Sequence, residues 1–339
     1  EIGVRLVGSE MCIRDRIKVK NLTKYFKISK RDNGFWGALK GLFVRKKIIK
    51  KALDGVSFEI ADGEIVGYLG PNGAGKSTTI KIMCGILTPT SGECEINGFV
   101  PYKQREKYVK NIGVVFGQRS QLFWDVPVID SYYLLKDVYK IPKDKFEERL
   151  KMLTETLELE ELLDIPLRQM SLGQKMKCEL AGSLLHDPKI LFLDEPTIGL
   201  DAVSKLQVRE FVKKINKELG VTVILTTHDM NDIEALTNRI ILIGKGKILY
   251  DGSFSEIKEK YRTEKIITVQ YAQAYEDYSL EGYELLEVVD KTAKYKFVGE
   301  FHLPKFTNFV SKKFDVVDIQ VEDLGLEEIM SKLYQEFEI

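Results

Sequence analysis

Residues 70–78 read Gly70-Pro71-Asn72-Gly73-Ala74-Gly75-Lys76-Ser77-Thr78. The stretch matches Gly-x-x-x-x-Gly-Lys-Ser/Thr, the pattern of a phosphate-binding loop. The apolar run from Ile65 to Leu69 leads into it, and a periodic apolar stretch follows at Ile80, Ile82, Met83, Ile86 and Leu87. This order predicts a buried strand, then a loop, then a helix.

The residue types of this loop suit a triphosphate. Glycines let successive backbone N–H groups point inward, and the start of the next helix adds positive potential. Lys76 supplies a point charge and takes part in hydrolysis, while the Ser77 hydroxyl is suited to Mg²⁺. We therefore expect residues 70–78 to bind the phosphates of ATP. A coincidental glycine turn is the alternative, which the flanking strand and helix disfavour.

A second strand ends in two carboxylates. Residues 190–193, Ile-Leu-Phe-Leu, are followed by Asp194 and Glu195. Both then lie at the carboxyl edge of a parallel sheet, where open α/β folds bind ligands. Asp194 is expected to hold the water shell of Mg²⁺, and Glu195 to polarise the water that attacks the γ-phosphate. Taken alone, Asp194 could instead cap the following turn.

A Ser-Leu-Gly-Gln sequence at residues 171–174 precedes a periodic apolar helix. Ser171 and Gln174 have the form of a capping box, which is a purely local role. The N-terminus of a helix is also suited to bind an anion, so this end could meet a nucleotide held elsewhere. Spacing alone leaves both interpretations open.

The rest of the chain predicts an α/β fold with added parts. Apolar strands at 190–193, 221–225 and 240–243 alternate with helical segments, which indicates a mainly parallel sheet. Short alternations after Ile17 are expected to form an antiparallel β subdomain. Helical periodicity between Val128 and Leu163 predicts a helical insertion, with a helical subdomain at about 119–186.

The expected domain boundaries follow from changes in the pattern of apolar and polar residues along the chain. Residues 1–16, which end in Met-Cys-Ile-Arg-Asp-Arg, resemble translated adapter sequence and are expected to be non-native. We expect residues 17–252 to form the main domain. Strand and helix patterns beyond Tyr261 predict a small α+β accessory domain, assigned to residues 253–339.

Composition limits the possible functions. Lys and Arg together number 51, as do Asp and Glu, so charge gives no reason to expect nucleic acid or an anionic bilayer as a partner. The longest apolar runs fall short of the roughly 20 residues that a spanning helix needs. The four cysteines are scattered without metal-ligand spacing, which fits a reducing cytosol.

The order of these motifs resembles that of the ATP-binding cassette (ABC) ATPases. The phosphate loop is followed by Gln118, the Ser171 helix, the Asp194-Glu195 pair, Gly-Leu-Asp at 199–201, and His228. The resemblance covers most of residues 17–252. It implies two domains packed head to tail. ATP would lie between the phosphate loop of one domain and the helix start of the other, which carries Ser171, Gly173 and Gln174.

The same resemblance implies further roles. Gln118 looks like the glutamine that reaches Mg²⁺ and the attacking water, and His228 looks like the switch histidine that contacts the γ-phosphate. Asp201 resembles the residue that couples the two composite sites. Each also has a local explanation, namely a strand end, a structural hydrogen bond and a helix N-cap.

Two departures from the family pattern stand out. Leu172 replaces the first of two adjacent signature glycines, which predicts an altered nucleotide affinity with activity retained. Lys46 and Lys47 occupy the neighbourhood where the family places an aromatic that stacks on adenine. Phe26 is our choice for that role, with Tyr25 as the alternative, and either could belong to the core.

Two aromatic segments are candidates for contacts with a membrane partner. Residues 34–43 predict a basic amphipathic helix that packs on its own domain or touches lipid headgroups or the partner. Trp124 lies in the region where the family receives a short permease helix. It is expected to be a contact anchor or, alternatively, a buried core residue.

The resemblance implies an ATP-hydrolysing subunit that energises a separate integral-membrane permease. The tail, with residues 317–319 and 326–329, resembles that of ATPases paired with drug and polysaccharide export permeases, so export is expected. The expected partners are a second ATPase subunit, as a homodimer, and the permease, with no nucleic acid. The expected location is the cytoplasm, peripheral at the inner face of the membrane. A soluble ABC ATPase acting on ribosomes or DNA is the alternative. One cassette, no sustained heptads and zero net charge disfavour it.

Overall fold

The computed structural model describes residues 15–29, 47–117, 119–261, 264–299 and 301–336. Contacts within the chain divide it after Asp251 into two compact units. In the described ranges, every helix is too short or too polar to cross a lipid bilayer.

A six-stranded sheet forms the centre of the first unit. Its order is β5-β6-β7-β3-β8-β9, and β3 pairs in parallel with β7 and β8, as β6 does with β5 and β7. The strands are β3 (Ile65–Leu69), β5 (Ile112–Phe116), β6 (Ile190–Asp194), β7 (Thr222–Thr226), β8 (Arg239–Gly244) and β9 (Lys247–Ser253). The inner strands are buried on both faces, which explains their continuous apolar sequences. The predicted mainly parallel sheet is confirmed.

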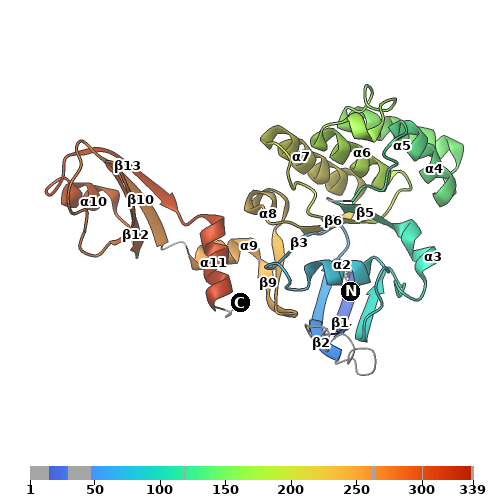
Figure 1. Ribbon diagram of the computed structural model, residues 1–339, viewed down its shortest axis with the longest axis horizontal. Coiled ribbons are helices and arrows are strands. Elements are labelled where there is room, and N and C mark those ends of the chain that lie inside the picture. The colour runs from blue at the N-terminus through green and yellow to red at the C-terminus, as the bar shows by residue number, and fades with distance from the viewer. Residues whose placement is uncertain (1–14, 30–46, 118, 262–263, 300, 337–339) are drawn as a thin grey trace, which may run out of the picture. The chain divides into compact units, whose positions relative to one another are not determined.

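An antiparallel sheet of three strands lies beside this layer. Its order is β2-β1-β4, with β1 at Asp15–Ser29, β2 at Lys47–Ala61 and β4 at Ser91–Ile96. Helix α2 (Lys76–Met83) lies between the two sheets (Figure 1), and its Ile80 packs into one core with Phe58 and Phe192. The amphipathic helix predicted at 34–43 lies outside the described residues.

Helices on the other side of the six-stranded sheet make up the predicted helical insertion and the crossovers (Figure 1). They are α4 (Val128–Tyr139), α5 (Lys143–Leu157), α6 (Leu172–Leu184) and α7 (Ala202–Leu219); the shorter α3 (Arg105–Tyr108) and α8 (Met230–Leu236) complete the unit. Helix α5 buries Phe146, Leu153 and Leu157, which lie on one helical face.

The second unit is a separate α+β fold. Its antiparallel sheet has the order β11-β12-β10-β13, formed by β10 (Glu264–Tyr271), β11 (Glu284–Val289), β12 (Thr292–Val298) and β13 (Val316–Asp323). Helices α9 (Phe254–Lys260), α10 (Leu303–Val310) and α11 (Leu326–Glu336) complete it. The core contains Tyr271 and Tyr295, whose hydroxyls share a 2.6 Å hydrogen bond.

Candidate functional site

The loop between β3 and α2 is built so that only glycine fits at two of its positions. Gly70 has φ +157° and Gly75 has φ +118°. A Cβ on Gly70 would lie 2.2 Å from the Ile243 carbonyl oxygen, and one on Gly75 would lie 2.7 Å from that of Ala52. Gly73, at φ +82°, has open space where a Cβ would stand. The backbone therefore turns back on itself around a small polar cradle.

Lys76 extends into this cradle. Its side chain is buried, and Nζ donates hydrogen bonds to the carbonyl oxygens of Gly70, at 2.6 Å, and Pro71, at 3.2 Å. Burial lowers the pKa of Lys76, while the carboxylates of Glu195 and Asp194 raise it. A buried ammonium held by carbonyl oxygens is a strong point donor for a phosphate oxygen.

A pocket of about 590 Å³ lies next to the loop. It brings together five residues singled out in the sequence, Asn72, Ser77, Asp194, Glu195 and His228. The Ser77 hydroxyl and the Asp194 carboxylate are oxygen donors of the kind that Mg²⁺ prefers, and one or two protein ligands suffice for this ion beside phosphates. The residues present therefore fit a magnesium nucleotide.

Glu195 and His228 are in direct contact. His228 Nε2 lies 2.7 Å from Glu195 Oε1. Glu195 is held at φ +57°, a left-handed conformation that is uncommon for a residue with a side chain. Its N–H donates to the Thr226 carbonyl at 2.9 Å, so the adjacent strand β7 fixes the turn. Such strain concentrates at functional sites.

Thr226 contacts a predicted site residue and was not singled out in the sequence. Its Oγ1 donates to Asp194 Oδ1 at 2.5 Å and so orients the predicted Mg²⁺ carboxylate. The available signal was a pair of threonines, Thr226 and Thr227, that directly follows the apolar run Val223 to Leu225. Lys81 and Arg119 also line the pocket and were not singled out.

Ser171 and Asp201 each cap a helix. The capping box predicted at Ser171 is present, since its Oγ accepts from Gln174 N at 3.2 Å and Gln174 Oε1 accepts from Ser171 N at 2.9 Å. Asp201 caps α7 by accepting from Ser204 N at 2.9 Å. A Cβ on Gly173 would lie 2.2 Å from Ser204 Oγ, so the starts of α6 and α7 touch. The structure shows these local roles, and the roles toward a second cassette stay predictions.

The sequence also predicted roles at the nucleotide for Gln118 and Phe26. Gln118 lies outside the described residues, although the next residue, Arg119, lines the pocket. Phe26 is 36% exposed on β1 and lies outside the pocket lining, with Lys24 Nζ 5.4 Å from its ring centroid. Its stacking role stays a prediction, but Phe26 is not a core residue.

Trp124 is also on the surface. It is 52% exposed, with Lys175 Nζ 4.4 Å from its ring centroid. The alternative that Trp124 is buried in the core is therefore wrong, because half of its side chain remains open to a partner.

A buried carboxylate anchors the segment after Gln118 to α6. Glu179 accepts a hydrogen bond from the Ser120 hydroxyl and another from Gln121 N at 3.2 Å. Burial raises the pKa of Glu179, and these hydrogen bonds oppose the rise. No sequence pattern pointed to Glu179, since a glutamate inside an amphipathic helix usually faces water.

Comparison with known proteins gives a consistent result. Residues 53–198 match the family model described as ABC transporter. The chain is 31% identical over 224 residues to the ABC transporter ATP-binding protein NatA of Bacillus subtilis, covering 66% of this chain and 91% of NatA. It is 29% identical over 304 residues to the linearmycin resistance ATP-binding protein LnrL of the same species, covering 87% of this chain and 96% of LnrL.

Solved structures resemble most of this chain. One is the dimeric post-hydrolysis state of the ATP-binding cassette MJ0796 bound to ADP and Pi. It matches with a TM-score of 0.58 and 28% identity, over 70% of this chain and 98% of that one.

Proposed function

This chain belongs to the ATP-binding proteins of the ABC transporter family, and on that premise we propose a function for each of its parts. It is an ABC transporter subunit that binds and hydrolyses ATP. Its working form is the magnesium nucleotide complex, and residues 17–252 form the ATPase domain. Residues 253–339 form an accessory domain.

The observation that carries this proposal is the convergence of Ser77, Asp194, Glu195 and His228 on one pocket beside the glycine cradle. Residues 70–78 bind the phosphates through backbone N–H groups and the Lys76 ammonium. Ser77 and Asp194 hold Mg²⁺, with Gln118 as a further ligand. When bound, this ion neutralises charge that develops on the phosphates.

Glu195 acts as general base toward the attacking water. Its carboxylate is oriented by the contact with His228 Nε2 at 2.7 Å. His228 contacts the terminal phosphate in turn, so one imidazole aligns the base and the reacting group. This arrangement lets a small displacement of the His228 loop switch hydrolysis on or off.

A second copy completes the site as a homodimer. The start of α6, with Ser171, Gly173 and Gln174, faces the nucleotide held by the partner cassette, and Asp201 links the two sites. Exposed apolar side chains near these helix starts support a contact surface there, namely Leu172, Ile198, Val203 and Leu206. The dimeric state of the similar MJ0796 cassette also supports it.

The membrane partner is a separate permease that binds around Trp124. The neighbouring aromatics Phe123 and Tyr133 are also exposed, and exposed aromatics of this kind act as interface anchors. The chain then lies at the inner face of the membrane through the permease. Export is the proposed direction, because the similarity to a resistance protein, LnrL, extends over 87% of this chain.

Calorimetric titration with ATP tests the nucleotide site. The parental protein is expected to bind ATP more tightly with Mg²⁺ than with EDTA, and Lys76→Met is expected to weaken binding at least about tenfold. Lys103→Met, which removes an exposed lysine outside the pocket, is the matched control. Equal affinity for Lys76→Met and the parent would reject the site.

A further inference from the structure

A fully buried carboxylate lies four residues after His228. Asp232, in the first turn of α8, is 0% exposed. Its Oδ2 accepts hydrogen bonds from the Thr197 and Thr227 hydroxyls, the latter at 2.9 Å, and its Oδ1 accepts from Arg209 Nε at 2.6 Å. A carboxylate so deep in the protein is tolerated only when paired and hydrogen-bonded, as here.

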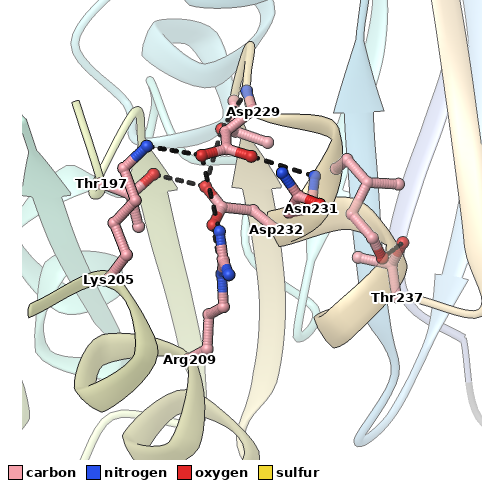
Figure 2. A network of polar contacts seen from close by, with 9 residues as sticks. Thr197, Lys205, Arg209, Asp229, Asn231, Asp232 and Thr237 are labelled. Atoms are coloured by element: carbon pink, nitrogen blue, oxygen red, sulfur yellow. Dashed lines mark hydrogen bonds and ion pairs between the residues drawn. The ribbon is translucent and has the colours of Figure 1, made fainter. Parts of the chain in front are cut away.

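A second acidic residue extends this network. Asp229 Oδ2 lies 2.6 Å from Lys205 Nζ and 3.5 Å from Arg209 Nη2. Figure 2 shows Lys205 and Arg209 reaching from α7 to these two carboxylates. Two cations thus face two anions, and the charge of the network is balanced.

The network joins two segments that carry site residues. Thr197 lies two residues after Glu195, and Thr227 directly precedes His228. Asp229 directly follows His228, and its N–H donates to Thr227 Oγ1 at 3.0 Å. The His228 backbone is therefore anchored on both sides.

We propose that Asp232 is a positioning residue that holds the His228 loop against the loop after Glu195, and so sets the contact between His228 and Glu195. The proposal rests on the proposed function of that pair in ATP hydrolysis. Asp232 acts through the Thr197 and Thr227 hydroxyls, one on each of the two loops.

Arg209 also connects Asp232 to helix α7. It lies on α7, whose N-cap is Asp201 at the proposed contact with a second cassette. Because α7 is a continuous helix from Ala202 to Leu219, a displacement of its start would be carried to Arg209 and from there to Asp232. A movement of the partner cassette at the start of α7 would therefore change the position of His228.

Single hydroxyl deletions test the proposal with little risk to folding. Thr197→Val and Thr227→Val each remove one donor to Asp232 while keeping the side-chain shape. Thr237→Val is the matched control, because the Thr237 hydroxyl is also buried but donates to Ile233 O in the last turn of α8, which Thr237 follows directly. For each variant, ATP affinity, KM, kcat and melting temperature are measured.

We expect the first two variants to lower kcat about tenfold while ATP affinity and KM stay within about twofold of the parent. Thr237→Val is expected to keep the parental kcat. Amide hydrogen exchange in nucleotide-free protein should become faster at residues 227–231 in Thr227→Val, because Asp229 N–H loses its acceptor.

A double variant with His228→Ala tests whether the threonine substitutions lower kcat through His228. If Thr197 acts through His228, adding Thr197→Val to His228→Ala should change kcat by less than about twofold. A full additional tenfold loss in the double variant would overturn the proposal, as would unchanged kcat in both threonine variants. If the parental protein itself failed to hydrolyse ATP, the proposed function would fail instead.

Discussion

The imidazole Nε2 of His228 lies 2.7 Å from Oε1 of Glu195. The two residues follow the neighbouring parallel strands β7 and β6, so the sheet itself brings them together. Glu195 adopts a left-handed backbone conformation to reach this position. The contact links the proposed general base to the residue proposed to sense the terminal phosphate.

Replacing His228 with alanine should lower kcat about 100-fold or more, because the base loses its orienting partner. ATP affinity should change little, since the phosphate cradle is intact. Phosphate release and nucleotide titration measure the two effects. His302→Ala, an exposed histidine in the second unit, is the control, and a His228→Ala protein with parental kcat would refute the assigned role.

Replacing Gly70 with alanine should destabilise the first unit by about 3 kcal/mol or more and abolish tight ATP binding, because the new Cβ would overlap the Ile243 carbonyl. Gly55→Ala is the matched control. It also has positive φ but no atom within 4 Å of the new Cβ, so it should cost only about 1 to 2 kcal/mol. Urea unfolding of the two variants compares them, and equal losses would contradict the cradle geometry.

Low pH should reduce the free energy of unfolding of the first unit, because the buried His186 resists protonation. Burial lowers the pKa of His186 from 6.5 to about 4, although a hydrogen bond to the Ile112 carbonyl opposes the shift. Between these values the unfolded chain takes up a proton that the native histidine does not. Stability from this group is therefore complete above pH 6.5 and declines as the pH falls, by about 2 kcal/mol at pH 5.

His186→Gln removes this titration while keeping an amide donor for Ile112 O. The difference in unfolding free energy between pH 7 and pH 5 should then shrink by about 2 kcal/mol relative to the parent. The two differences are compared by denaturation at each pH. Identical pH dependence in both proteins would show that His186 is not buried in its neutral form.

Trp124→Ala should uncouple transport before it affects basal ATP hydrolysis. The Trp124 side chain is half exposed and does not line the pocket that holds the proposed catalytic residues. Transport by the ATPase and permease together, and ATPase activity of the isolated chain, are measured in parallel. Loss of basal hydrolysis with transport retained would reverse the prediction and reject the anchor.

The fold could be predicted from the sequence because the residue types of each segment agree with the place of that segment in the fold. The strand, the glycine loop and α2 were predictable because the backbone at Gly70 and Gly75 has a positive φ and no room for a Cβ, so both positions require glycine. The strands of the sheet were readable because burial on both faces forces continuous apolar runs.

Other features were hidden because they depend on contacts between distant segments. Asp232 bonds Thr197 from 35 positions away and Arg209 from 23, and no periodicity encodes such a partnership. Exposure of Trp124 was equally undecidable, since an isolated aromatic fits a core or an interface. The roles of Gln118 and Phe26 stay predictions.

The most direct test of the account is the behaviour of Glu195→Gln with ATP and Mg²⁺, followed by size-exclusion chromatography and phosphate release. We expect the variant to lose at least about 100-fold in hydrolysis rate and to elute as an ATP-dependent dimer. A variant that remains monomeric with ATP and hydrolyses it at the parental rate would contradict the account.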